Sequence, residues 1–307
     1  MFDLVGVGNP VYDSIITPFS RTDGRVLSGC STNACLAAKR LGLKRVGLVG
    51  CIGTDYRSRF KAEMEGFGVE VSVDEASKET GGFHLVYDEK GDRTLDVLGV
   101  AGRIRPESFP EEFLQAKFIL IGPILGEVDQ ELVDYLRSST SSKLFLDPQG
   151  LIRTIGDNNR IVHKCDSDQF AKIARKVDFI KPNEPESRTI TGETDELLSL
   201  SRLREMSEAV PIITLAERGS VLFDDGELRR IPPYPTNAID PTGAGDVYAG
   251  SFITHYSGGA SLAVAGMYAS AAASIKIEQV GPSFQLSDAA VGERVRMIRD
   301  RTVSGVQ

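Results

Sequence analysis

The sequence predicts an α/β fold, with a doubly wound, mostly parallel sheet, helices on both faces and a small β lid. Short apolar runs alternate with stretches of helical apolar spacing from Phe2 to Arg301, as in a series of β-α-β units. One segment breaks this order, because Phe83 to Val97 alternates apolar and polar residues around a turn, as a hairpin does. The sequence has no internal repeat, so we expect a single domain over residues 1–307.

Composition and charge argue against several classes of binding partner. The chain has 307 residues, a formal net charge of -8 and a pI near 5.1, which argues against a general nucleic-acid or anionic-membrane binder. Four scattered cysteines show no Cys-x-x-Cys spacing, so a zinc site or a disulfide framework is not expected. The chain begins without a basic leader and has no apolar run of membrane-spanning length, so we expect a cytoplasmic protein.

The first predicted strand, Phe2 to Val7, runs into Gly6-Val7-Gly8-Asn9-Pro10. This is a weak dinucleotide fingerprint, because the third glycine is missing and Pro10 stands where the helix should begin. Val11 to Thr17 is predicted to be extended and to carry Asp13 just beyond the first strand. Sheets of this class bind ligands at that edge, so Asp13 could accept hydrogen bonds from substrate hydroxyls. The alternative is a solvated turn aspartate.

A polar cluster precedes the first predicted helix. The stretch Ser28-Gly29-Cys30-Ser31-Thr32-Asn33 leads into apolar residues at helical spacing, so the cluster is expected at the N-terminus of that helix above the sheet. Its alternative explanation is an ordinary N-cap by Ser31 or Thr32.

The hairpin around Asp88 to Asp92 cannot easily join a parallel sheet. We expect it to form a lid together with the extended segments before Ser28, so that the lid comprises about residues 11–28 and 80–103. Arg93 or Arg103 could reach an anionic ligand from the lid, although most arginines are solvated surface residues.

A long loop follows the predicted strand Lys143 to Leu146. It begins Asp147-Pro148-Gln149-Gly150-Leu151-Ile152-Arg153 and continues to Lys164. Long loops in compact domains are often functional, which makes Gln149 and Arg153 candidates for substrate binding. The competing interpretation is a surface Ω-loop.

Asn183 and Glu186 follow the predicted strand Asp178 to Lys181. Three residues apart, they would lie on one side of a helical turn, and an amide with a carboxylate suits a Mg²⁺ ion that keeps several waters. The alternative is that Glu184 and Glu186 are simply acidic residues that stabilise the first turn of a helix. The next predicted strand, Pro211 to Leu215, contains Thr214 and is followed by Gly219. Further along, Asp224-Asp225-Gly226 predicts a hairpin turn.

The most informative stretch reads Asp240-Pro241-Thr242-Gly243-Ala244-Gly245-Asp246 and then becomes helical. Free amides at a helix start bind anions, yet Asp246 places a carboxylate beside them. That combination makes sense if Asp246 removes a proton from a hydroxyl that attacks phosphorus. The alternative is a loop glycine pair followed by a first-turn aspartate.

Two helices are expected after this stretch. The first, Ser261 to Ile275, is rich in alanine, and the second runs from Asp288 to Arg301. Small side chains allow close helix packing. Between them Gly281-Pro282-Ser283 forms a turn.

The motifs together resemble the ribokinase-like (PfkB) carbohydrate kinase family over nearly the whole chain. Asp240 to Asp246 resembles the C-terminal signature, and Asn183 with Glu186 the Asn-x-x-Glu motif. The Asp147 to Arg153 stretch is similar to archaeal inositol kinases, and a nucleoside kinase is a related alternative. Ser28 and Ala216 stand where the family pattern has glycine.

The resemblance assigns roles to individual residues. It implies that Asp246 is the general base and that the amides of Gly243, Ala244 and Gly245 stabilise the transferred phosphoryl group. The other roles it implies are acceptor binding by Asp13, Gly29, Asn33, Gln149 and Arg153, nucleotide binding by Asn183, Thr214, Gly219 and Gly245, and Mg²⁺ binding, through water, by Asn183 and Glu186.

The expected reaction is transfer of the γ-phosphoryl group of ATP to a hydroxyl of a small sugar or polyol, with an inositol as one candidate. A monovalent cation near the Gly281 turn and a homodimer through the lid are further expectations from the family. A nucleoside kinase of the same fold and a non-catalytic sugar-sensing protein are the alternatives.

Overall fold

A nine-stranded sheet forms the centre of the computed structural model, which describes residues 1–77, 79–89, 91–224 and 226–304. Its strand order is β15-β14-β13-β12-β9-β8-β1-β4-β5. The pairs from β13 to β5 are parallel, and β14 and β15 add an antiparallel edge. The bounds are β1 Leu4–Val7, β4 Val46–Gly53, β5 Glu70–Ser77, β8 Phe118–Ile121, β9 Lys143–Leu146, β12 Phe179–Ile180, β13 Val210–Thr214, β14 Ser220–Asp224 and β15 Glu227–Ile231.

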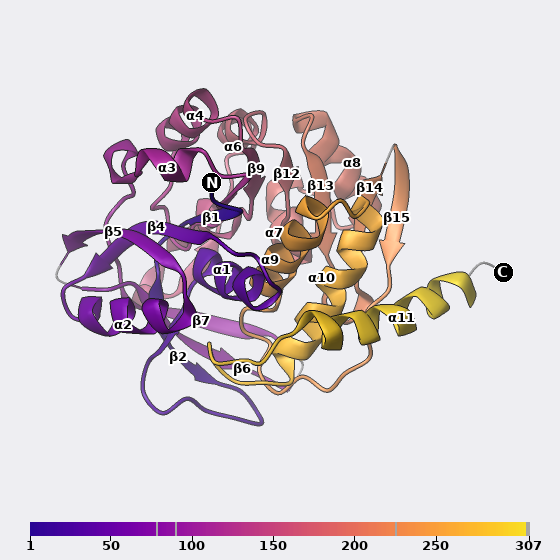
Figure 1. Ribbon diagram of the computed structural model, residues 1–307, viewed down its shortest axis with the longest axis horizontal. Helices are drawn as coiled ribbons and strands as arrows, with labels where there is room; N and C mark the ends of the chain where they lie inside the picture. The colour runs from indigo at the N-terminus through magenta and orange to yellow at the C-terminus, as the bar shows by residue number, and fades with distance from the viewer. Residues whose placement is uncertain (78, 90, 225, 305–307) are drawn as a thin grey trace.

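Helices cover both faces of this sheet (Figure 1). Alternate residues of each strand point to opposite faces, so β1 sends Leu4 into one core and Val5 into the other. One face packs against α1 Cys30–Arg40, α2 Arg57–Phe67, α9 Ala244–Ser257, α10 Leu262–Ile277 and α11 Asp288–Ser304. The other packs against α3 Glu111–Leu114, α4 Gln130–Ser139, α6 Ser167–Ala174, α7 Glu184–Thr191 and α8 Glu196–Met206.

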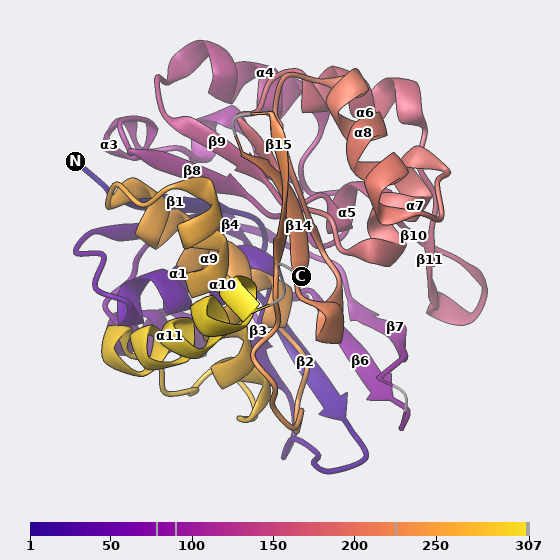
Figure 2. The same cartoon turned by 90° about the vertical axis from the view of Figure 1, so that its right-hand side faces the viewer.

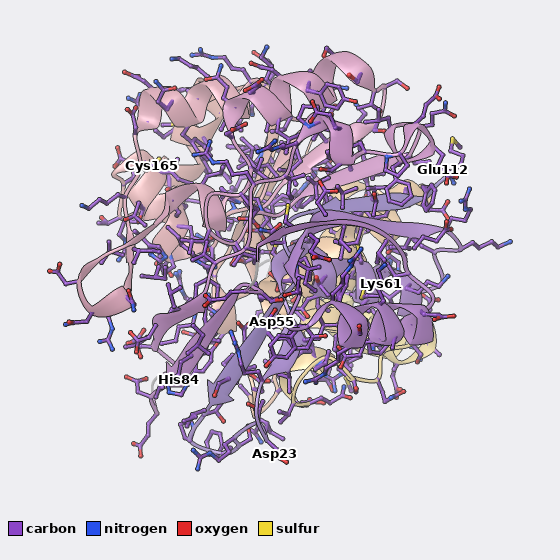
Figure 3. All side chains as sticks on the ribbon, turned by 90° about the vertical axis from the view of Figure 1, so that its left-hand side faces the viewer. Asp23, Asp55, Lys61, His84, Glu112 and Cys165 are labelled. Carbon is purple, nitrogen blue, oxygen red and sulfur yellow. The ribbon has the colours of Figure 1, made fainter. Side chains whose placement is uncertain are left out.

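The lid is a separate four-stranded sheet in the order β3-β2-β6-β7. Its strands are β2 Val11–Ile16, β3 Val26–Ser28, β6 Gly82–Tyr87 and β7 Arg93–Gly99. The β6–β7 pair is the expected hairpin, while β2 and β6 run parallel. In Figure 2 these strands project from one end of the central sheet. Figure 3 shows His84 of β6 and Asp23 of the β2–β3 loop at that end, far from Glu112 of α3.

The segment after β9 is ordered, and the Ω-loop alternative is wrong. A single helical turn, α5 Gln149–Ile152, is followed by a hairpin of β10 Arg153–Ile155 and β11 Ile161–His163. Arg160 in this hairpin makes two hydrogen bonds to Asp96 of β7, at 2.8 and 3.1 Å. The hairpin therefore contacts the lid and closes one side of the space beneath it.

Some local expectations needed correction. Helix α1 begins after Gly29, whose φ of 117° only glycine adopts readily, and no side chain caps it. The alternative of a Ser31 or Thr32 cap is therefore wrong: the Ser31 hydroxyl donates to the carbonyls of Val7 and Gly122. Strand β5, rich in acidic residues, was not anticipated. The β14–β15 hairpin is present, although Asp225 of its predicted turn lies outside the described residues.

Within the described part of the chain, no helix combines the length and apolarity needed to cross a lipid bilayer. Cys30, Cys35, Cys51 and Cys165 are free cysteines. Cys165 lies apart from the lid and from the helices α1 and α2 (Figure 3).

Candidate active site

A cavity of about 1130 Å³ runs between the lid and the carboxyl edge of the central sheet. Its walls include every residue to which the family resemblance assigned a role except Asn33. Asn33 is nevertheless tied to the cavity through Asp246. The cavity has one end under the lid and another between β13, α10 and the 232–241 segment. The Gly243 turn lies between these two ends.

The turn before α9 is shaped by a buried carboxylate. Asp240 Oδ1 accepts the amide of Thr242 at 3.0 Å, a local bond that favours turns. Gly243 then adopts a left-handed φ of 79°, and α9 begins at Ala244. Among the described residues the amides of Gly243 and Gly245 have no hydrogen-bond acceptor, whereas that of Ala244 donates to Pro241 O at 3.2 Å. The helix start therefore offers two free N–H groups to an anion.

Asp246 lies in the first turn of α9, and two other elements hold its carboxylate. Asn33 Nδ2 of α1 donates to Asp246 Oδ2 at 2.9 Å. Gln149 Nε2 of α5 lies 3.4 Å from Asp246 Oδ1. The carboxylate is partly exposed and lines the cavity. Amide donors on both oxygens orient it while leaving lone pairs for a substrate hydroxyl.

A buried ion pair lies beneath the same turn. Lys181 Nζ is 2.9 Å from Asp147 Oδ2, and both side chains are almost fully buried. A Cβ atom at Gly245 would lie 3.3 Å from Lys181 Nζ, so the ammonium group sits directly against the turn. Burial alone would lower the pKa of Lys181, but the Asp147 and Glu186 carboxylates raise it above its ordinary value. The site thus keeps a fixed positive charge beside the turn before α9.

Asn183 and Glu186 form a reciprocal capping box at the start of α7. Asn183 Oδ1 accepts the Glu186 amide at 2.8 Å, and Glu186 Oε2 accepts the Asn183 amide at 2.9 Å. Both residues line the cavity, and burial followed by the Asp147 charge raises the pKa of Glu186. The first-turn alternative and the metal hypothesis are therefore compatible. The side-chain oxygens of Asn183 and Glu186 already accept the capping hydrogen bonds. They are therefore better suited to hold a hydrated Mg²⁺ through its water molecules than to coordinate the ion directly.

The end of the cavity under the lid contains Asp13 and Gly29. Asp13 is 3% exposed, and its Oδ1 accepts the Phe83 amide at 2.8 Å. Burial raises the pKa of Asp13 to about 6. The alternative of a solvated turn aspartate is therefore wrong. A side chain at Gly29 would bring a Cβ within 2.9 Å of Asn9 O, so this backbone stays bare on the cavity wall.

Arg153 supplies a buried cation to the same end. It is 6% exposed, its Nη1 donates to Ile124 O at 3.3 Å, and its Nε has no partner among the described residues. Buried donors are rarely left unpaired, so a ligand atom here would complete the site. Apolar side chains of Phe83, Leu85 and Leu95 face this space.

The other end of the cavity is formed by the β13–β14 connection. Thr214 and Gly219 both line it. Gly219 has a φ of 86°, and a Cβ there would lie 2.0 Å from Ile231 O. Ala216 also has a positive φ, 51°, so it adopts a backbone conformation that glycine takes more readily. Tyr234, Ala273 and Ile277 contribute apolar side chains to the wall of this end.

Several site residues were missed or left undecided from the sequence. Asp147 was noted only as the first residue of the loop motif and Lys181 only as the end of its strand, although a charged residue at the end of each apolar run was a usable signal. The thiol of Cys30 and carboxylate oxygens of Asp147 and Asp246 lie within 4.8 Å of one another. Of the two lid arginines, Arg93 lines the cavity and donates to Tyr87 OH at 3.0 Å. The Arg103 side chain is 74% exposed and pairs with Asp129.

Comparison with known proteins identifies relatives of the whole chain. Residues 20–289 match the pfkB family carbohydrate kinase model. A cytidine kinase of Thermococcus kodakarensis is 30% identical over 85% of this chain and 91% of its own. A nucleoside kinase of Methanothermobacter thermautotrophicus is 26% identical over 96% of this chain and 94% of its own.

Among solved structures, a pyrophosphate-dependent kinase in the ribokinase family, complexed with a pyrophosphate analog and myo-inositol, superposes with a TM-score of 0.81. It is 21% identical over 96% of this chain and 100% of its own, which shows a shared fold. The sequence relatives and the matched family model cover most of the chain. The chain therefore belongs to the pfkB family of carbohydrate kinases and is a phosphotransferase with an alcohol group as acceptor.

Proposed function

We propose that this kinase transfers the γ-phosphoryl group of ATP to a hydroxyl of a small sugar or polyol, with an inositol as one candidate acceptor. The observation that carries the proposal is the placement of Asp246. Its carboxylate is beside the two free amides at the start of α9, and donors from α1 and α5 orient it. A base and an anion site at the midpoint of one cavity suit an in-line transfer between its two ends.

In this mechanism Asp246 accepts the proton of the acceptor hydroxyl as its oxygen bonds to phosphorus. The bond from phosphorus to the bridging oxygen of ATP breaks, and ADP leaves with that electron pair. The amides of Gly243 and Gly245 stabilise the phosphoryl oxygens, and Ala244 joins them once its bond to Pro241 is released. Lys181, held by Asp147 beneath Gly245, adds a fixed charge in a site of low dielectric.

Residues for a cation and for the nucleotide are also present. A bound Mg²⁺ would neutralise phosphate charge. Asn183 and Glu186 would hold its water shell, and Asn183 Nδ2 would remain free to donate to a phosphate oxygen. Thr214, Gly219 and the wall of Ala273 and Ile277 would receive the rest of the nucleotide.

The acceptor would bind under the lid. Asp13 and Gln149 offer acceptors and donors for hydroxyl groups, and Arg153 Nε is an unpaired buried donor. Asn33, which lies outside the cavity wall, would act by holding Asp246. Gly29 allows close approach to the backbone. The apolar lid face of Phe83, Leu85 and Leu95 would cover the C–H face of a sugar or cyclitol ring.

A nucleoside acceptor is the second candidate. Two observations favour it: the apolar lid face could also stack on a base, and the relatives from Thermococcus and Methanothermobacter are named for cytidine and nucleosides. A sugar-sensing protein without catalysis is the third, and the complete set of Asp246, Asn183 and Glu186 argues against it.

One panel experiment separates these candidates. The protein is incubated with MgATP, and separately with pyrophosphate, together with myo-inositol, ribose, fructose, cytidine and adenosine, and products are detected by mass spectrometry. Phosphorylated inositol or sugar supports the main proposal, and phosphorylated cytidine or adenosine supports the second. Thermal stabilisation by an acceptor without any turnover would favour the sensor and overturn both kinase assignments. Turnover with pyrophosphate alone would overturn ATP as the donor.

The remaining expectations belong to the same proposal. Residues 1–307 would act as one domain, with the lid from about 11–28 and 80–103, in the cytoplasm. A homodimer through the lid is supported by the exposed apolar side chains Phe19, Leu98 and Val100. Sedimentation analysis of wild type and Phe19→Ser tests it, because a lid dimer should dissociate in the variant, and an unchanged mass would exclude this contact.

A further inference from the structure

A second buried ion pair stands directly behind the Gly243 turn, outside the mechanism described above. Lys276 of α10 is 2% exposed and Asp240 is 0% exposed. Lys276 Nζ lies 3.7 Å from Asp240 Oδ2 and donates to Gln279 O at 3.2 Å. The ring of Phe284 lies 5.8 Å from the same nitrogen. The ammonium is thus enclosed by a carboxylate, a carbonyl and an aromatic face.

Asp240 connects this ammonium to the anion site. Its Oδ1 accepts the Thr242 amide at 3.0 Å, and its Oδ2 accepts the Gly281 amide at 3.3 Å. The Asp240 amide in turn donates to Ile277 O at 3.0 Å. Three segments therefore meet at one carboxylate: the turn before α9, the end of α10 and the Gly281 turn. A change in the position of Asp240 would move the Thr242 amide and, through it, Gly243.

A carboxylate in this environment needs a counter-charge. An isolated buried carboxylate is strongly destabilising, and oxygens from a carboxylate and a backbone carbonyl are the ligands that hard cations take in proteins. An ammonium group and a potassium ion are similar in size and charge, so either could satisfy this oxygen pair. Burial lowers the pKa of Lys276, and the Asp240 carboxylate opposes that shift.

We propose that Lys276 is a tethered monovalent cation: its ammonium takes the place of a free K⁺ at Asp240 and positions the anion turn before α9. The family resemblance implies a monovalent cation near the Gly281 turn, and here Lys276 would supply that charge from the chain itself. Lys276 is a positioning residue, because it acts on the turn through Asp240. The enzyme would then need no added monovalent cation. The kinetic part of the inference rests on the proposed phosphotransfer, whereas its stability part does not.

The test compares salts of equal ionic strength, namely KCl, NH₄Cl, NaCl and choline chloride. Wild-type turnover should be the same within about twofold in all four. Lys276→Met leaves an oxygen site without its cation, so turnover in choline chloride should fall at least about tenfold and recover in KCl or NH₄Cl. Lys39→Met is the matched control, because Lys39 also donates to a carbonyl, Lys44 O, but is only partly buried and makes this bond at the surface. It should behave as wild type in every salt.

Thermal unfolding in the same salts gives a readout without substrate. Lys276→Met should gain a K⁺-specific rise in melting temperature that wild type lacks, and Asp240→Asn/Lys276→Met should lose it. If Lys276→Met does not fold in choline chloride, folding only in KCl supports the proposal. If it folds in no salt, Lys276→Gln replaces it. A wild-type enzyme that needs K⁺, or a Lys276 variant equally impaired in all salts, would overturn the inference. Absence of turnover with every acceptor would reject the phosphotransfer but leave this stability test decisive.

Discussion

Asn33 donates a hydrogen bond of 2.9 Å to the carboxylate of Asp246, which lies 213 residues further along the chain. The bond joins the first turn of α1 to the first turn of α9, and these helices pack side by side on one face of the sheet (Figure 1). The two helix starts that face the cavity are thereby locked to each other. The orientation of the proposed base consequently depends on α1, the helix that also begins at the acceptor end.

Replacing the proposed base tests the chemistry most directly. Asp246→Asn keeps the size of the side chain and an oxygen that can accept from Asn33, but it cannot take up a proton at neutral pH. General base action contributes about 10²- to 10⁴-fold, so kcat should fall by that order while the melting temperature changes little. The measurement is steady-state turnover with the acceptor found in the panel. Turnover close to wild type would remove Asp246 from the mechanism.

Gly243 should tolerate no side chain, for two reasons that act together. Its φ of 79° costs an L-residue roughly 1–2 kcal/mol. A Cβ atom would also lie 2.9 Å from Asn33 Nδ2 and push that donor away from Asp246. We expect Gly243→Ala to lose stability by roughly 1–2 kcal/mol and kcat by at least about tenfold.

Gly66→Ala is the matched control for this change. Gly66 lies within α2, has no positive φ and has open space where its Cβ would be. Its replacement should leave kcat unchanged and raise stability by up to about 1 kcal/mol. Equal effects of the two substitutions on kcat would contradict the argument for Gly243.

Ala216 has a left-handed backbone conformation that is strained for a residue with a side chain. Removing the side chain should therefore stabilise the protein. Its φ is 51°, a region that costs L-residues roughly 1–2 kcal/mol. Ala216→Gly should therefore raise the free energy of unfolding by about 0.5–1 kcal/mol, after the entropy of the new glycine is subtracted. Urea denaturation measures it. Ala62→Gly, at an exposed position within α2, should lower the free energy of unfolding. If both substitutions changed this free energy in the same direction, Ala216 would not be strained.

The fold was readable from the sequence where each element has its own local pattern. Strand β9 matches its expected range, Lys143 to Leu146, because it is a short, mostly buried apolar run with a clear stop. Strand β5 was missed because Glu70, Asp74 and Glu75 interrupt its apolar residues. It is an edge strand, paired only with β4 in the described sheet, so one side of it tolerates charge.

The site was readable only in part, for a related reason. Asp13, Asn183 and Asp246 follow strands or a glycine turn, and that position alone predicts the ligand edge of the sheet. The ion pairs Lys181–Asp147 and Lys276–Asp240 join segments that are distant in the sequence, and no local periodicity encodes such a pairing. Ser31 was expected as a possible cap, but the close approach of α1 to β1 turns its hydroxyl toward the sheet.

Asp13 predicts how the enzyme responds to acid. Burial raises its pKa from 3.8 to about 6, so the folded state binds the proton more tightly than the unfolded chain does. The stabilising contribution of the protonated form is complete below about pH 3.8 and is lost as pH rises through about 6. Relative to Asp13→Asn, wild type should therefore lose stability on the order of 2–3 kcal/mol between pH 4 and pH 7. Denaturation of both proteins across that range measures the difference.

The titration of Asp13 should also affect acceptor binding, but for binding the ionised form is the favourable one. Above about pH 6 the Asp13 carboxylate is ionised and can accept hydrogen bonds from two hydroxyls, whereas the protonated form accepts them less well. The acceptor KM of wild type should rise several-fold as pH falls from 7 to 5, while that of Asp13→Asn should be high and nearly constant. Asp23→Asn, in the exposed loop at the end of the lid (Figure 3), should follow the wild-type curve. Parallel KM profiles for wild type and Asp13→Asn would show that Asp13 does not contact the acceptor, because a residue that only supports the lid through Phe83 would change stability without changing the pH dependence of KM.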